Sequence, residues 1–189
     1  ATLTSLNIEG DSGDDTQVVA TPPPPVAPEV PASASRSIET SGQAGDLASV
    51  PNGSMPDHLL SQISFAPGHY GYWAAVEALE AMNEAFVADT GYNLGINNMY
   101  RSGYAGRSFH GWGLAIDFAN QSGAVLGWDD MQYQWLWNHG ADYGFYLPFW
   151  ASPSGNPEPW HWEFGSYYRG NDSDCYSACP ANRQFLVRH

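Results

Sequence analysis

The chain divides at about residue 55, and this division limits most strongly what it can fold into. Residues 1–55 contain no aromatic side chain and are rich in Ser, Thr, Gly, Ala, Pro and Asp. The proline-rich stretch at 22–31 favours extended polyproline geometry. Such a segment cannot bury enough apolar surface to fold by itself. We therefore expect an acidic tail, linker or extended arm at 1–55 and one folded domain at 56–189.

Hydrophobic periodicity and helix-ending signals predict the elements of that domain. Apolar residues recur every three or four positions over 72–87, which is the pattern of a helix, and Thr90-Gly91 is a typical helix end. A second helix is expected from Asp129 or Asp130 to His139, with Gly140 as its stop. Strands are expected at 92–100, 114–118, 144–150 and 160–164.

Two short stretches carry the residues from which we infer chemistry. The segment 108–117 contains His110 and Asp117, and the second stretch reads Glu158-Pro159-Trp160-His161. A catalytic zinc takes three protein ligands and keeps a position for water, whose pKa it lowers to about 7. His110, Asp117 and His161 can fill the ligand positions, which leaves Glu158 as the base that takes and returns the proton.

The spacing also excludes other sites and leaves ordinary explanations open. No His-Glu-x-x-His occurs, which excludes the helical metalloprotease arrangement. A His and an Asp seven residues apart arise by chance in many proteins, so the zinc prediction depends on both stretches occurring together. For Glu163, which follows His161 by two residues, we expect a solvated strand position rather than a contact with the metal ligand.

The pattern S-x-H-x-x-G-x-A-x-D followed by E-P-W-H resembles the VanY-type D-alanyl-D-alanine carboxypeptidases, which are zinc peptidases of bacterial cell-wall metabolism. The resemblance covers roughly residues 60–170. It implies an α+β fold, with a small antiparallel sheet flanked by helices and a zinc site in the cleft over the sheet. It also implies that His110, Asp117 and His161 bind Zn²⁺ and that Glu158 acts as general base and acid.

Further site residues follow from the same resemblance. The family uses an arginine in a Y-R-S stretch to polarise the scissile carbonyl, and Arg101 occupies the matching position. In most relatives a helix separates this arginine from the S-x-H motif, whereas here a short loop does. Arg107 at the end of that loop therefore competes with Arg101. Ser108, Trp112 and Trp160 are expected to contact substrate with it, although Ser108 can equally brace the turn before the histidine.

The function implied by the resemblance is hydrolysis of peptidoglycan stem peptides, with D-Ala-D-Ala as the preferred bond. One alternative is an L-Ala-D-Glu endopeptidase, as in phage endolysins or virion-associated lysins. Such enzymes more often carry Asp at the base position, so Glu158 favours the carboxypeptidase. Another alternative is a non-catalytic wall-binding or structural protein on the same fold, against which the intact Glu158 argues.

Charge and targeting signals bear on partners and location. The net charge is −14 and the sequence contains no lysine, so no basic patch is available for nucleic acid or anionic membranes. No signal peptide or membrane-spanning stretch appears, and the chain begins with Ala1 rather than Met, as after removal of a leader or trimming. We expect a secreted bacterial enzyme or a phage lysin or virion component, acting outside the cell or in the wall. The N-terminal arm is expected to dock on a partner protein or assembly.

Cys175 and Cys179 are the only two cysteines. Their spacing predicts a small disulfide loop, which suits an extracellular setting. Two free thiols are the first alternative, and zinc binding by the pair is the second.

Overall fold

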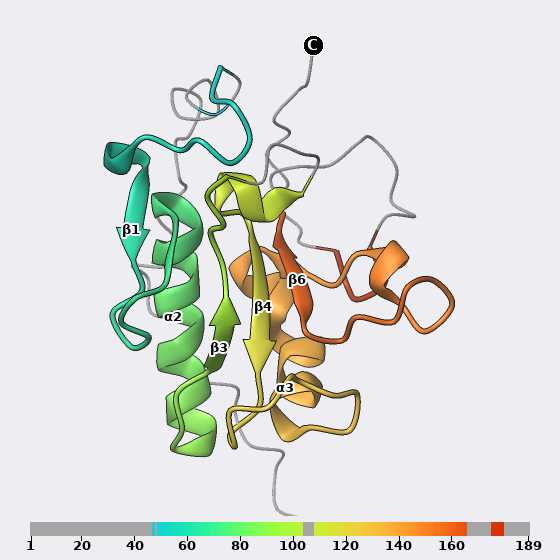
Figure 1. Cartoon of the computed structure of the whole chain (residues 1–189). Coiled ribbons are helices and arrows are strands. Elements are labelled where there is room, and N and C mark those ends of the chain that lie inside the picture. The colour runs from blue at the N-terminus through green and yellow to red at the C-terminus, as the bar shows by residue number, and fades with distance from the viewer. Residues whose placement is uncertain (1–46, 48, 104–107, 166–174, 180–189) are drawn as a thin grey trace, which may run out of the picture. The chain divides into compact units, whose positions relative to one another are not determined.

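The computed structural model describes residues 47, 49–103, 108–165 and 175–179. The predicted extended arm lies outside the described residues apart from its last part. The described part combines helices with small antiparallel sheets, which confirms the predicted α+β class (Figure 1). Within it, no helix is long and apolar enough to cross a membrane.

The main sheet has four antiparallel strands in the order β3-β4-β6-β5. These strands are β3 (Gly95–Asn98), β4 (Ala115–Ala119), β5 (Phe145–Tyr146) and β6 (His161–Phe164). A smaller two-stranded sheet pairs β1 (Leu60–Gln62) with β2 (Tyr70–Tyr72). The two stretches that carry the predicted site thus supply adjacent central strands.

Strands β4 and β6 have one apolar and one polar face. Side chains alternate along a strand, and the register pairs Ile116 with Trp162 and Asp117 with His161. Ile116 and Trp162 belong to the hydrophobic core. Trp162 packs edge-on against Tyr133 of the helix that follows β4, with ring centroids 6.2 Å apart. The opposite face of the same strands therefore collects the polar side chains.

Helix α2 (Trp73–Thr90) confirms the helix predicted for 72–87 and its end. Gly91 adopts a left-handed conformation with φ of 78°, and its amide donates to the carbonyl of Val87. Phe86 of α2 meets Trp135 edge-on at 5.2 Å. Trp135 lies in helix α3 (Met131–His139), so this aromatic contact joins the two helices of the core.

The predicted end of α3 is confirmed, because the helix ends at His139 and Gly140 is its C-cap. Gly140 has right-handed helical geometry (φ −54°), and the chain continues through the 3₁₀ turn η4 (Gly140–Tyr143) to Gly144, whose φ is 84°. Packing against Trp162 also favours glycine at position 140. A Cβ there would lie 3.0 Å from the ring of Trp162, so a larger residue would require that ring to shift.

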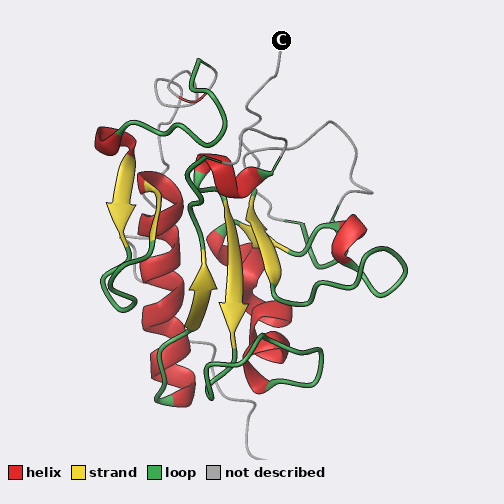
Figure 2. Cartoon of the chain, viewed as in Figure 1, coloured by secondary structure: helices red, strands yellow, loops and turns green. Residues whose placement is uncertain are grey.

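Two predicted strands are shorter than expected. The strand expected at 92–100 is limited to β3, whose pairing with β4 shifts register between Ile96 and Asn98. The strand expected at 144–150 ends after Tyr146, because Pro148 cannot donate a ladder hydrogen bond. The chain then forms the 3₁₀ turn η5 (Phe149–Ala151). The connection from β5 to β6 is therefore a long loop interrupted by η5 (Figure 2).

Residues 49–55, which composition groups with the tail, contact the domain directly. The amide of Gly53 donates to the carbonyl of Gly111 at 2.8 Å, and its carbonyl accepts from the amide of Gly103 at 3.0 Å. We call residues 49–55 the N-terminal seam. Through Gly53 it ties the loop that follows Arg101 to the turn that carries His110.

The predicted disulfide between Cys175 and Cys179 is confirmed. The small loop that it closes holds the segment after β5, because Tyr176 donates its amide to the carbonyl of Leu147 at 2.8 Å. The hydroxyl of Ser177 accepts from the amide of Leu147 at 2.9 Å. The disulfide loop therefore braces the chain between β5 and η5.

Replacing Cys175 and Cys179 together by serine is expected to lower the free energy of unfolding by about 2 kcal/mol, the loop-closure contribution of so short a loop. Urea unfolding of both proteins, with and without reductant, checks this. The wild-type midpoint should fall toward that of the variant in reductant, while the variant should not respond. Equal midpoints in oxidising buffer would contradict the bracing role.

Candidate metal centre

His110 projects from the 3₁₀ turn η3 (Phe109–Trp112), which precedes β4. The hydroxyl of Ser108 accepts a hydrogen bond from the amide of His110 at 3.3 Å and so caps the turn. Gly113 ends it with φ of 64°, a conformation that favours glycine. The carbonyl of His110 accepts from the amide of Arg101 at 3.1 Å. Local backbone bonds therefore hold these two side chains next to each other.

Three buried side chains meet on the polar face of the sheet. His110 Nε2 lies 3.1 Å from Asp117 Oδ1, and His161 Nδ1 lies 3.1 Å from the same oxygen. The two ring nitrogens are 3.2 Å apart. The three residues are 3 to 5% exposed. They form the one group in the described residues that offers three metal-binding atoms within a few ångströms of each other.

The other nitrogen of each imidazole has a hydrogen-bond acceptor. His110 Nδ1 lies 2.6 Å from the carbonyl oxygen of Met99, and His161 Nε2 lies 3.2 Å from Glu163 Oε1. Each of these nitrogens can therefore donate its hydrogen outward, which in the metal-bound state frees the lone pairs of His110 Nε2 and His161 Nδ1 beside Asp117 Oδ1. Three electron-pair donors point toward one place.

The spacing of the three donors fits a divalent metal ion. Zinc bonds of about 2.0 to 2.2 Å in a tetrahedral site separate neighbouring ligands by about 3.3 to 3.5 Å. The separations of 3.1 to 3.2 Å between the donors are within a few tenths of an ångström of this. Outward hydrogen bonds from both ligand histidines are also typical of metal sites. The residues present can therefore hold a metal and leave further coordination positions for other ligands.

Burial and hydrogen bonding also shift the pKa values of the donors. Burial would raise the pKa of Asp117, but hydrogen bonds from His110 and His161 outweigh it and hold the pKa well below its usual range. Burial would lower the pKa of His161, but its bonds to Asp117 and Glu163 raise the pKa to about 9. Without metal, a proton on His161 thus supplies part of the positive charge that the carboxylates require.

The metal-free protein is expected to lose stability as the pH rises from about 6.5 to 9. The pKa of His161 is about 9 in the folded state against 6.5 in an exposed histidine, so its contribution is complete below pH 6.5 and lost as the pH passes 9. Urea unfolding in chelator at pH 6.5 and pH 9.5 measures it. The variant His161→Gln should show a smaller pH difference than the wild type, and equal differences would contradict the assignment.

Arg101 extends this cluster on its exposed side. Its Nη2 donates to Asp117 Oδ2, so the carboxylate is shared between the guanidinium and the two imidazoles. Its Nε is buried and has no hydrogen-bond partner among the described residues. The competing Arg107 lies outside the described residues.

Glu158 lies in the loop that leads from η5 into β6. Its amide donates to the carbonyl of Ala151 at 2.9 Å, and its carbonyl accepts from the amide of His161 at 3.0 Å. The half-buried side chain accepts from Asn156 Nδ2 at 2.5 Å. A tight turn therefore places Glu158 three residues before the candidate metal donor His161, and the hydrogen bond from Asn156 restrains its carboxylate.

Sequence reasoning missed three residues around His161. The predicted solvated position of Glu163 is wrong, because it is 4% exposed and bonded to His161 and to the hydroxyl of Tyr146. The signal was present, since residues two apart on a strand share a face. Trp150 on η5 lies with its ring 4.8 Å from that of His161 and is 45% exposed. No local pattern in the sequence identifies this contact.

The predicted substrate-contacting residues lie near the centre with differing surroundings. Ser108 is exposed and caps the turn, which is the bracing role considered from the sequence. Trp112 is half-buried, and its indole nitrogen donates to the carbonyl of Val50 in the N-terminal seam at 3.0 Å. Trp160 is half-buried against the hydrophobic core. Their contacts with substrate stay predictions.

Residues 96–167 match the family described as VanY: D-alanyl-D-alanine carboxypeptidase. The match covers less than half of the chain. It contains Arg101, the three candidate metal donors and Glu158. A search of curated proteins finds no match for the chain.

Three solved structures are similar to this chain. They are the LdcB LD-carboxypeptidase (24% identity, 59% of this chain and 70% of that one, TM-score 0.47) and the vancomycin-resistance D,D-pentapeptidase VanY in complex with Zn(II) (21%, 58% and 82%, 0.44). The third is the L,D-carboxypeptidase DacB from Streptococcus pneumonia (23%, 57% and 72%, 0.36). Scores below 0.5 carry no information on a shared mechanism or substrate.

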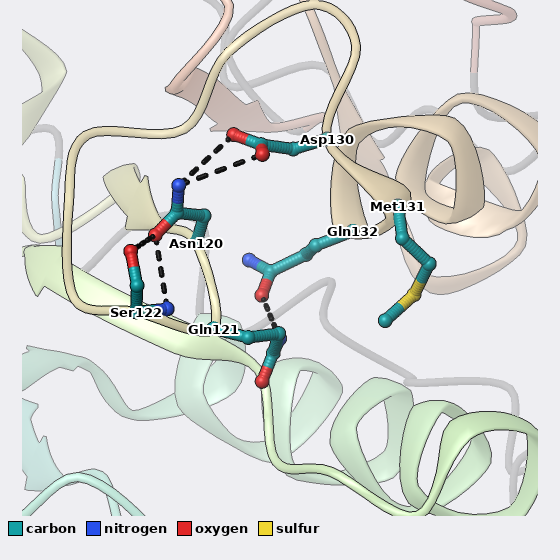
Figure 3. Close-up of a pocket in the computed structure, with 6 residues that line it drawn as sticks. All are labelled: Asn120, Gln121, Ser122, Asp130, Met131 and Gln132. Atoms are coloured by element: carbon teal, nitrogen blue, oxygen red, sulfur yellow. Dashed lines mark hydrogen bonds between the residues drawn. The ribbon is translucent and has the colours of Figure 1, made fainter.

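A separate hollow of about 330 Å³ lies beside the loop that follows β4 (Figure 3). Its lining contains none of the predicted site residues and consists of Asn120, Gln121, Ser122, Asp130, Met131 and Gln132. Its polar groups bond mostly to each other: Asn120 bonds Ser122 and Asp130, and Gln121 bonds Gln132. These hydrogen bonds brace the loop between β4 and α3.

Proposed function

We propose that this chain is a zinc-dependent peptidase that acts on peptidoglycan stem peptides, with the terminal D-Ala-D-Ala bond as its preferred substrate. The arrangement of His110, Asp117 and His161 is the observation that carries the proposal. Their three lone pairs converge at metal-binding distances inside the stretch that matches the VanY family, directly beside a turn that carries Glu158.

The residues around the triad have complementary roles in peptide hydrolysis. Bound zinc would supply Lewis acidity toward a carbonyl oxygen and would acidify a water ligand. Glu158 would accept a proton from water and return it to the departing amine. Arg101 would donate to the carbonyl oxygen on which negative charge develops. The exposed indole of Trp150, next to His161, would form one wall for the substrate.

Charge supports this assignment of Arg101. It is the one lysine or arginine in the described residues, and its Nε has no partner there. A peptide that ends in a free carboxylate brings negative charge to the site, and the partly exposed side chain of Arg101 can attract it. The surrounding protein is acidic, so a single cation beside the metal gives an anionic substrate one favourable approach.

The proposed place of action is the cell wall or the extracellular space. The Cys175–Cys179 disulfide is typical of oxidising compartments. A substrate of stem peptides requires the same location. Docking of the acidic N-terminal arm on a partner protein or assembly stays part of the proposal, as does secretion by a bacterium or release from a phage particle.

Mass spectrometry of purified muropeptides tests the proposal. Zinc-loaded protein is incubated with disaccharide pentapeptide, tetrapeptide and tripeptide, beside a chelated sample and the variant Glu158→Ala. Loss of one alanine from the pentapeptide alone is expected, and both controls should be silent. Loss of the tetrapeptide's terminal residue would reassign the bond to an L,D-linkage. A cut between L-Ala and D-Glu would establish the endopeptidase, and intact peptides with bound zinc would establish the non-catalytic alternative.

A further inference from the structure

Glu163 is a buried carboxylate that the proposed hydrolysis does not use. Its Oε1 lies 3.2 Å from His161 Nε2, and its Oε2 accepts from the hydroxyl of Tyr146 at 2.9 Å. Because His161 Nδ1 is one of the three metal donors, a continuous chain of hydrogen bonds runs from Tyr146 through Glu163 to the metal position.

The register of the sheet builds this chain from three strands. Glu163 on β6 lies opposite Tyr146 on β5 and opposite Ala115 on β4. Directly opposed residues in antiparallel strands place their side chains next to each other on one face. Ala115 is fully buried, and its single methyl group leaves room for the carboxylate between the strands. The small residue at 115 therefore has a structural purpose two positions before Asp117.

Among the described residues, one side chain can bring positive charge to the buried carboxylate of Glu163, and that side chain is His161. A buried carboxylate is strongly unfavourable unless positive charge or several hydrogen bonds reach it. The sequence has no lysine, and Arg101, the one arginine in the described part, pairs with Asp117. Positive charge then reaches Glu163 through the ring of His161, which requires that the opposite ring nitrogen hold a cation.

We propose that Glu163, held in place by Tyr146, is a positioning residue that sets the metal affinity and the ligand geometry of His161. This inference rests on the proposed metal-dependent function. A carboxylate that accepts the Nε2 hydrogen keeps the Nδ1 lone pair on the metal and makes the imidazole a stronger donor. His110 lacks such a partner, since its ring bonds the backbone carbonyl of Met99. Substitution of a neighbouring side chain can therefore change the metal affinity at His161 but not at His110.

The test compares metal binding and not only catalysis. The variant Glu163→Gln keeps the shape and removes the charge. We expect its zinc affinity, measured by competition with a chromophoric chelator, to fall by about 10- to 100-fold. The visible absorption spectrum of the cobalt-substituted protein should shift in wavelength and intensity, because the donor strength of His161 changes. Tyr146→Phe keeps the charge, so its affinity should lie between those of the wild type and Glu163→Gln.

A matched control separates positioning from simple loss of stability. Gln132 is also a buried polar residue, and it bonds both the amide and the carbonyl of Gly95 at the edge of β3. The variant Gln132→Leu should lose stability and keep wild-type zinc affinity and cobalt spectrum. The inference is overturned if Glu163→Gln binds zinc within threefold of the wild type, or if all three variants lose affinity in proportion to their loss of stability.

Two further outcomes keep the inference apart from the proposed function. If Glu163→Gln does not fold, Tyr146→Phe carries the test, and a cobalt spectrum identical to the wild type overturns the inference. If the wild type binds neither zinc nor cobalt, the proposed function itself fails. If the wild type binds zinc and hydrolyses stem peptides while Glu163→Gln binds zinc equally well, only the role assigned to Glu163 fails.

Discussion

Replacing Glu158 by glutamine is expected to lower the hydrolysis rate of a D-Ala-D-Ala peptide by about 10²- to 10⁴-fold, the usual contribution of a general acid and base. Zinc content should remain at the wild-type level, because the three proposed metal donors are His110, Asp117 and His161. Glutamine also preserves the hydrogen bond from Asn156, since its side-chain oxygen can accept it. Steady-state kinetics together with metal analysis of the purified variant measure both quantities.

Glu77→Gln is the control for this prediction. Glu77 is an exposed glutamate on α2, so its neutralisation changes the net charge equally without touching the centre. It should retain wild-type kinetics. If Glu158→Gln keeps more than a tenth of the wild-type rate, Glu158 is not the proton-transfer residue, and another carboxylate near His161 must be sought.

Replacing His110 by alanine is expected to abolish both hydrolysis and stabilisation by zinc. The wild type should gain about 2.7 kcal/mol in unfolding free energy when zinc is present at one hundred times its dissociation constant. The variant loses one of three donors, so this gain should disappear. His110 is the suitable ligand to remove, because its outward bond goes to the backbone of Met99 and leaves no buried carboxylate unpaired there. Thermal unfolding with and without zinc measures the gain.

His139→Ala supplies the comparison for the metal ligand. His139 lies at the end of α3, where its ring stacks on Trp135 with centroids 4.6 Å apart. This variant is expected to keep full zinc stabilisation. A zinc-dependent gain in stability that persists in His110→Ala would place the metal elsewhere, and the site assignment would have to be abandoned.

The sequence was sufficient to predict the helices and strands that show a clear apolar periodicity or contain a motif. Regular apolar spacing predicted α2, and the buried run before and after Asp117 predicted β4. The order of the two motifs predicted which side chains to examine for a metal site, and the structure brings His110, Asp117 and His161 together. These features depend on neighbours within a few residues or on a motif, so a single sequence is enough to find them.

Features that depend on contacts between residues far apart in the sequence could not be predicted from the sequence alone. Glu163 reads as an ordinary polar strand residue until the register places Tyr146 beside it. The end of α3 at Gly140 was predictable, but the close approach of the Trp162 ring to that glycine was not. The contact of Trp150 with His161 was not predictable either. In each case the partner found only in the structure is more than ten residues away in the sequence.

The N-terminal seam has a consequence for anyone who moves this catalytic unit into another protein. The family match begins at residue 96, after both the seam and α2. A graft cut at that boundary would expose the core that α2 covers and would lose the hydrogen bonds of Gly53 to the carbonyl of Gly111 and the amide of Gly103. Since those bonds join the backbone on either side of Arg101 and His110, the transplanted unit would lack the alignment of its own donors. A transferable unit must begin no later than Leu47, the first described residue of the core.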